Sequence, residues 1–281
     1  MNKNGVKLVA AACAAMAASA AGAQTRGGFE VGAELFDYNY RERLEGETIV
    51  KDDGLVTGLT LGYVETIGNG TFLRARLKGA SGSVDYRGSG MDGGARLGAR
   101  LDDVSQSIGQ LELHVGKDFQ LGAGSTLTPF IGLGTRVLVD ESGGEVSEDG
   151  LLGYDREVAY AYVPIGVATR FRLGGRSALT VSAQYNWVAG GDVTSKFSEI
   201  DDEAPNVKVQ LDDGHGFELS AIASVPVGGS EINFGPFFRR WDIGRSRSFI
   251  LRDPGGSGES IEFFEPRNHT SELGLRVSYS F

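Results

Sequence analysis

Two short stretches of the chain carry residue types that could hydrolyse a peptide bond. Asp213 and His215 are separated by one glycine, and Asp102 and Asp103 form an adjacent acidic pair in the first half of the chain. An imidazole beside a carboxylate can act as a general base that activates water for attack on a carbonyl. Adjacent aspartates point to opposite sides of an extended strand, however, and Gly214 indicates a loop. These four residues are the candidate catalytic group.

Two other motifs are weaker. Residues 88–93, Gly-Ser-Gly-Met-Asp-Gly, match a dinucleotide-binding fingerprint in letters only, and we interpret them as a loop because no strand–helix junction surrounds them. His269-x-Ser271 resembles the His-x-Ser of lipid A deacylases, but that family's downstream Asn is absent. By strand parity both residues share the face of Leu273. The sequence therefore predicts no cofactor and no metal site.

The N-terminal residues predict export. Lys3 and Lys7 precede an apolar stretch, and the small residues 21–23 suit a signal peptidase, so we expect a cleaved signal peptide over residues 1–23. The alternative is acylation at Cys13. Cys13 is the only cysteine, so the mature chain, residues 24–281, is expected to use neither disulfides nor thiol catalysis.

Charge and hydropathy narrow the function classes. The chain has 27 Lys and Arg against 37 Asp and Glu, which excludes the electrostatic footprint of a nucleic-acid-binding protein. No later segment has eighteen consecutive apolar residues, so no transmembrane helix is expected. A membrane location would require a closed sheet.

Ten segments alternate in polarity with a period of two, which predicts an all-β fold. They are 29–41, 55–67, 71–81, 106–119, 126–139, 158–172, 178–188, 216–227, 231–243 and 270–281. Pro164 and Pro236 fall inside two of them, and we expect a bulge at each. Residues 35–40 change polarity, which suggests a further bulge in the first segment.

Segment and connection lengths favour a closed antiparallel up-and-down transmembrane β-barrel of about ten strands. The segments are long enough to cross a bilayer at a tilt, and four tight turns alternate with five long connections. Both termini are then expected in the periplasm. The chain end, with Gly274, Val277, Tyr279 and Phe281, resembles the C-terminal assembly signal of Gram-negative outer-membrane barrels. The resemblance implies insertion by the barrel assembly machinery, with outer-membrane lipid and lipopolysaccharide as partners.

Charged residues recur on the face opposite the apolar one. The predicted lumen network comprises Arg74, Arg76, Lys78, Glu112, His114, Arg136, Arg170, Arg172, Glu218, Arg239, Glu272 and Arg276, with Glu30 and Glu34 from the first segment. A barrel of ten strands is narrow, and unpaired buried charge is costly, so these groups should pair and largely plug the lumen. The alternative is a narrow, anion-preferring, porin-like channel.

The candidate catalytic residues also resemble those of omptins, which are ten-stranded outer-membrane proteases. The resemblance implies that Asp213 and His215 lie at one side of the external mouth and Asp102 and Asp103 at the other. This chain departs from that pattern because its two aspartates are adjacent and the aromatic context is absent. We therefore expect a non-enzymatic cell-surface barrel, structural or adhesin-like, whose external loops could engage a ligand. An omptin-like peptidase is the remaining alternative.

Overall fold

A computed structural model describes residues 27–92, 95–122, 124–174, 177–252 and 260–281. The predicted signal peptide, residues 1–23, lies outside the described residues. Within the described ranges no helix is long and apolar enough to cross a membrane. In the described part of the chain, one 3-10 turn, η2 (Phe197–Glu199), interrupts a fold built from strands.

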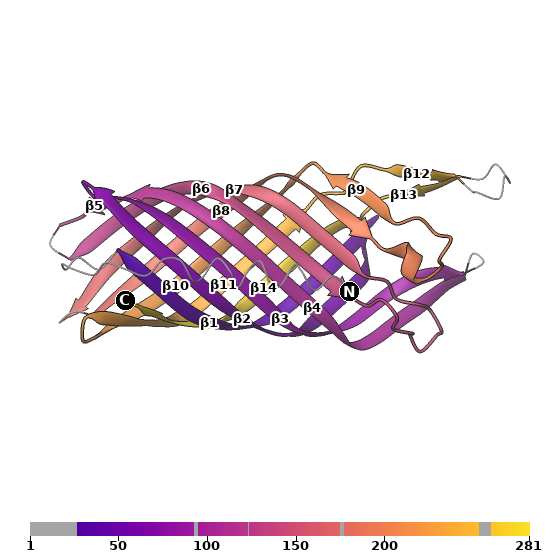
Figure 1. The fold of residues 1–281 in the computed structure, drawn as a ribbon, viewed down its shortest axis with the longest axis horizontal. Helices are drawn as coiled ribbons and strands as arrows, with labels where there is room; N and C mark the ends of the chain where they lie inside the picture. The colour runs from indigo at the N-terminus through magenta and orange to yellow at the C-terminus, as the bar shows by residue number, and fades with distance from the viewer. Residues whose placement is uncertain (1–26, 93–94, 123, 175–176, 253–259) are drawn as a thin grey trace.

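The strands form a closed antiparallel barrel, which confirms the predicted fold class (Figure 1). Barrel strands that follow one another in the sequence pair with each other, and β1 pairs with β14 to close the barrel. The ten barrel strands are β1 (Gly28–Leu44), β2 (Glu47–Gly68), β3 (Thr71–Asp92), β4 (Ala95–Lys117), β6 (Ser125–Glu141), β7 (Arg156–Gly174), β8 (Ser177–Ser195), β10 (Gly214–Val227), β11 (Ser230–Ile243) and β14 (Arg267–Ser280).

Short strands complete the wall at both ends. β5 (Phe119–Gln120) pairs with β6. β9 (Val207–Leu211) pairs with the last residues of β8 and so continues the line of β10. β12 (Phe249–Arg252) and β13 (Ser260–Phe263) form a separate hairpin that projects from one end of the barrel (Figure 1).

The two ends of the barrel differ. Tight connections, such as Asn69-Gly70 between β2 and β3, gather at one end, which we call the turn end. Both of these residues have positive φ, 50° and 75°, as a two-residue type I′ hairpin turn requires. The opposite end, which carries η2 and the β12–β13 hairpin, is the loop end.

Two predicted long loops are mostly strand. β1 and β2 continue to a tight turn at Glu45-Gly46, and β3 and β4 pair as far as Asp92 and Ala95. Residues 88–92, interpreted as a loop from the sequence, therefore belong to β3. The alternation of polar and apolar residues predicts shorter strands, because it ends where the outer face becomes polar.

The three expected bulges are absent at the predicted positions. Pro164 and Pro236 each leave two residue pairs without ladder bonds on one side, and the register is the same on either side of each proline. A register shift in the β7–β8 pair lies nearby, between Ala161 and Tyr162. A proline lacks only its own N–H, so one neighbouring strand loses pairing while the other keeps it. In β1 the register with β14 is continuous from Glu30 to Arg43, and the register with β2 shifts between Glu42 and Arg43, beyond residues 35–40.

The polarity change in β1 reflects a change of surroundings. Glu34 points inward and Leu35 outward, whereas Tyr38 and Tyr40, further toward the loop end, point inward and Asn39 faces the outside. The same change occurs around the whole barrel. We call the zone nearer the turn end, where apolar side chains face outward, the apolar belt. Its outward side chains are Val31, Leu35, Leu55, Leu59, Leu61, Leu73, Leu111, Leu113, Val115, Ile131, Leu133, Ile165, Val167, Val181, Leu219, Phe234, Leu273, Leu275 and Val277.

The second zone, which we call the upper barrel, has an apolar interior. Its buried core includes Phe36, Tyr38, Tyr40, Val56, Val84, Val104, Ile108, Leu138, Tyr160, Tyr162, Val188, Phe237 and Trp241. Polar side chains face outward here, so this part of the cylinder is organised like a water-soluble barrel.

Candidate functional site

The centre of the lumen is filled by a charged network inside the apolar belt. Arg239 donates hydrogen bonds to Glu34 at 2.7 Å, Glu218 at 2.7 Å and Glu272 at 2.8 Å. Lys78 donates to Glu272 at 3.0 Å. Glu272 and Glu34 come from neighbouring strands, β14 and β1, while Lys78 crosses the lumen from β3. Arg136 on β6, on the opposite side of the barrel from β14, also donates to Glu272, so these bonds span the lumen and close the passage.

A second group of the predicted residues lies around Glu112. This carboxylate is buried and accepts hydrogen bonds from Tyr162 at 3.0 Å and Gln184 at 2.9 Å. Arg76 approaches it at 3.6 Å and His114 at 3.9 Å. Glu112 thus links β4 with β7 and β8 across the interior.

Sequence reasoning missed the neutral members of this network. Tyr162, Gln184 and Gln110 face inward and hydrogen-bond with the charged groups; Gln110 accepts a bond from Arg136 at 3.2 Å. Strand parity could have found all three, because they share the inward face with residues that were predicted. Charge alone does not distinguish these amide and phenol groups.

The remaining predicted network residues lie toward the turn end. Arg170 is bonded to Glu231 at 2.8 Å, and Arg276 to Glu34 at 2.7 Å. Arg172 does not join the network: it is exposed at the last residues of β7. The prediction placed it inside because parity was extended beyond the point where the lumen opens.

The turn end contains a hollow below the charged network. Its volume is about 280 Å³. The lining includes Arg74, Arg76, Arg170, Glu231 and Phe130. We call this hollow the vestibule; the charged network forms its ceiling.

Above the network, aromatic side chains fill the upper barrel. Trp241 contacts Tyr162 edge-on at 4.9 Å and Tyr160 at 5.3 Å between ring centroids. The guanidinium of Arg136 lies 5.3 Å from the Trp241 ring and so joins the charged network to the apolar core. Trp241 is 1% exposed, so the core is sealed at this level.

A buried acidic pair, Glu42 and Glu265, lies at the top of the upper barrel. Arg156 donates to Glu265 at 2.8 Å and also to Glu42, which accepts from Tyr40 at 2.8 Å. Burial raises the pKa of the Glu265 carboxyl to about 8. Glu265 belongs to the segment between β13 and β14, so this contact ties a loop to the barrel.

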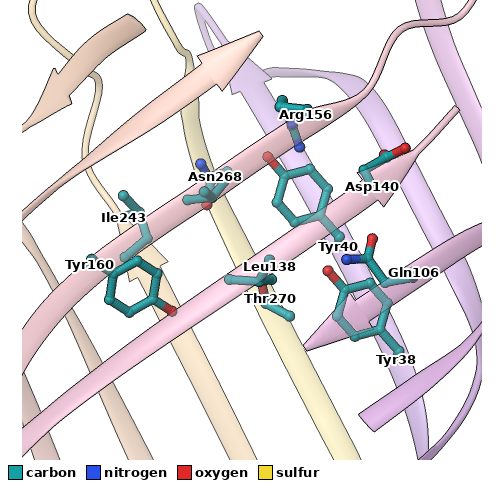
Figure 2. Close-up of a pocket in the computed structure, with 11 residues that line it drawn as sticks. Tyr38, Tyr40, Gln106, Leu138, Asp140, Arg156, Tyr160, Ile243, Asn268 and Thr270 are labelled. Carbon is teal, nitrogen blue, oxygen red and sulfur yellow. The ribbon is translucent and has the colours of Figure 1, made fainter. Parts of the chain in front are cut away.

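A small cavity of about 10 Å³ adjoins Arg156, lined also by Asp140, Gln106 and Asn268. Figure 2 shows the side chains of Asp140 and Asn268 on either side of Arg156 and Tyr40. One oxygen of Asp140 and the amide nitrogen of Asn268 have no partner in the described part of the chain. The space suits one water molecule bonded to both.

Loop residues close the end of the barrel above this cavity. Tyr154 packs on Phe197 at 4.6 Å, and Phe197 packs on Phe263 at 5.3 Å between ring centroids. Lys196 pairs with Asp155 at 2.9 Å. We call this layer the loop cap.

The candidate catalytic residues form two exposed pairs, one on β4 and one at the start of β10. His215 is exposed and stacks on Tyr185 at 6.1 Å between ring centroids. Asp102 accepts a hydrogen bond from Arg100 at 3.1 Å, and Asp103 is exposed beside it on β4. Asp213 is exposed between β9 and β10. β6, β7 and β8 separate the two pairs along the barrel wall.

The other motifs also lie apart from the lumen. His269 and Ser271 are on β14 with the outward parity of Leu273, as strand parity predicts. Among the described residues no group of three or more His, Cys, Asp or Glu is arranged to hold a metal ion.

The predicted assembly signal forms the seam of the barrel. The backbone groups of Phe281 and Phe29 exchange two hydrogen bonds of 2.9 Å, and the Phe281 ring stacks against Phe29 and Tyr279. Gly274 allows β14 to lie close to β1, because a Cβ there would be 2.3 Å from the carbonyl oxygen of Leu35. Val277 faces outward in the apolar belt.

Comparison with known proteins shows the fold only. No family model matches the chain, and the curated proteins searched give no match. Among solved structures, the outer membrane protease OmpT from Escherichia coli is similar with a TM-score of 0.60 and 13% identity, covering 93% of this chain and 99% of that one. The translocator domain of the autotransporter NalP from Neisseria meningitidis has a TM-score of 0.39 and 10% identity, covering 96% and 92% of the two chains.

Proposed function

We propose that the protein is an integral outer-membrane barrel that does not conduct and that holds a rigid loop surface outside the cell. The apolar belt supports the location, since outward apolar side chains encircle all the barrel strands at one level while charged groups pair inside. In this orientation the turn end faces the periplasm.

The observation that carries the non-conducting role is the filled lumen. Glu272 and Arg136 are both 0% exposed at the centre, and Trp241 is 1% exposed above them. An ion would have to displace the charged network, the upper core and the loop cap in turn. The plugged barrel therefore accounts for the structure better than the narrow anion channel does.

Planar-bilayer recording tests this proposal. Purified protein inserted at high protein-to-lipid ratio should give no discrete conductance steps in molar KCl. Insertion is verified separately by co-flotation with the lipid after urea washing. Regular single-channel steps from inserted protein would refute the plugged barrel and favour a pore.

The proposal assigns no enzymatic activity, and the candidate residues allow a direct check. A fluorogenic peptide panel should show the same signal for the wild type and for the Asp213→Ala/His215→Ala variant. Turnover that disappears in this variant would instead support an omptin-like peptidase. Fold likeness to OmpT alone does not favour that outcome, because at 13% identity it shows the fold only, and the His215 ring stacks on the exposed Tyr185.

A further inference from the structure

The vestibule at the turn end has no role in the proposed function. Its lining runs from Gly27 and Gly229 at the rim to Gln184 and Glu218 below the charged network, so it is open to solvent at the turn end. Its volume of about 280 Å³ is the space of about nine water molecules. The vestibule is therefore large enough for a small organic solute that enters from this end.

An acid and a base face the vestibule at one level of the wall. Glu30 on β1 and Arg76 on β3 are both paired with Gly62, which lies between them on β2. Two strand spacings separate their Cα atoms by about 10 Å along the sheet. Gly62 has no side chain to fill the wall between them, and it lines the vestibule itself. The row thus presents a carboxylate and a guanidinium to one hollow.

The Glu30 carboxylate has little compensation for its charge. It is half-buried and accepts a hydrogen bond from the Ser280 hydroxyl at 3.1 Å. Arg170, another vestibule residue, is held by Glu231 at 2.8 Å. No Lys or Arg in the described part of the chain forms an ion pair with Glu30. A half-buried carboxylate in this state favours a cationic group beside it.

The Arg76 guanidinium has N–H donors left for a ligand. Its nearest carboxylate oxygens belong to Glu112 at 3.6 Å and Glu218 at 3.9 Å, which is beyond hydrogen-bond distance. Although Arg76 points inward, its side chain is 25% exposed. A guanidinium carries five N–H donors, so Arg76 can bind the carboxylate of a solute and stay near both glutamates.

Hydroxyl groups line the opposite wall of the vestibule. Ser182 on β8 and Ser220 on β10 lie 2.7 Å apart across the barrel from β2. One hydroxyl donates to the other, so one proton of the pair remains for a solute. Val64 and Ile222 add apolar surface to the same hollow. This lining suits a solute that carries short apolar groups as well as charge.

From this arrangement we propose that the vestibule binds a small zwitterion, a free amino acid or a dipeptide, with its ammonium group on Glu30 and its carboxylate on Arg76. An extended dipeptide is about 7 Å long, so its two ends reach both groups. In the orientation proposed above the vestibule faces the periplasm, and the ligand comes from that side. The inference goes beyond the proposed function, because a plugged barrel needs no ligand.

Isothermal titration calorimetry of the protein in detergent micelles tests the site, with alanyl-alanine as the probe. Two blocked forms, N-acetyl-alanyl-alanine and alanyl-alaninamide, each lack one of its charges. The wild type should bind the free dipeptide about tenfold more tightly than either blocked form. Glu30→Gln should lose the advantage over the N-acetyl form, and Arg76→Gln should lose the advantage over the amide.

The matched controls are Glu65→Gln and Arg172→Gln, which remove an exposed carboxylate from the outer face of β2 and an exposed arginine from the end of β7. Both controls should keep both advantages. Ser182→Leu leaves Glu30 and Arg76 in place but fills the hollow, and it should abolish binding of all three probes.

Three results would each overturn the zwitterion site: equal affinity of the wild type for free and blocked forms, loss of selectivity in the controls, or unchanged binding in Ser182→Leu. Heat-modifiable migration in gels shows whether the variants fold, and Ser182→Leu decides where a charge variant does not. Calorimetry in detergent requires no membrane insertion, so a negative result leaves the proposed function intact. Conductance steps in a bilayer refute the proposed function and leave the site untouched.

Discussion

At the scale of single residues, Glu272 holds the centre of the lumen. It accepts hydrogen bonds from Lys78, Arg136 and Arg239, which come from three different strands. With Glu272 fully buried, its removal leaves three cations facing one another in a poorly solvated space. Only an ionised carboxylate serves all three donors at once.

Glu272→Ala should therefore lower the free energy of unfolding by about 3–5 kcal/mol. Urea titration of the protein in lipid vesicles, followed by tryptophan fluorescence, measures the change. Arg172→Ala removes a charge that the structure places outside the network and should shift stability by less than about 0.5 kcal/mol. Equal effects of the two substitutions would show that the network contributes no special stability.

Glu265 predicts a pH dependence of the loop cap. Its pKa is raised from an ordinary value of 4.5 to about 8 by burial, so the folded protein binds this proton more tightly than the unfolded chain does. Stability should decline as the pH rises from about 4.5 to 8, and then level off. Glu265→Gln stays neutral and lacks this contribution.

Urea titrations at pH 5 and pH 8 give the free energy of unfolding of Glu265→Gln minus that of the wild type. This difference should be more than about 1 kcal/mol larger at pH 8 than at pH 5. Glu262→Gln, on the exposed hairpin strand β13, is the control and should show no such difference between the two pH values. A constant offset for Glu265→Gln would contradict a buried proton at this position.

At the scale of elements, β14 is the strand that closes the barrel. Gly274 lets it approach β1, because the space for a Cβ is occupied by backbone atoms of Leu35 and Phe36. Gly274→Ala should destabilise the barrel by about 1–3 kcal/mol, since the seam must move apart. Gly109→Ala on β4 meets nothing within 4 Å and is the matched control. The folded fraction on semi-native gels checks both.

The strands illustrate what sequence can and cannot predict. The alternation of polar and apolar residues predicts all the barrel strands, because the outer face of each strand contacts a single environment along the apolar belt. The upper halves of β3 and β4 were missed where the outer face turns polar, as at Ser83 and Asp85. The inward position of Tyr162 follows from strand parity, but its pairing with Glu112 across the lumen could not be predicted, because the curvature of the barrel and not the local pattern sets it.

At the scale of the whole molecule, one cylinder combines two arrangements of polarity. In the belt, Leu133 is 66% exposed while Arg136 is buried; in the upper barrel, Trp241 is buried and the neighbouring Arg240 is outside. Each arrangement suits one solvent on the outer wall. The level at which the outer wall changes from apolar to polar is therefore fixed by the folded chain.

Leu133→Arg should cost about 2–4 kcal/mol of stability in vesicles, because it places a charge in hydrocarbon. Glu141→Arg lies eight residues beyond Leu133 on the same face of β6, outside the belt, and should be nearly neutral. Urea titrations in vesicles compare the two. In detergent, where water reaches the wall more easily, the difference should shrink; a difference that persists would indicate a packing defect instead.

The boundary in polarity also sets the immersion depth of the molecule. A displacement of two residues outward would leave leucines in water, and the same displacement inward would carry Arg41 and Lys51 toward the acyl chains. Vertical drift is therefore opposed in both directions. The loop cap is held at a constant height above the lipid surface, and anything that touches it from outside meets a platform of defined elevation.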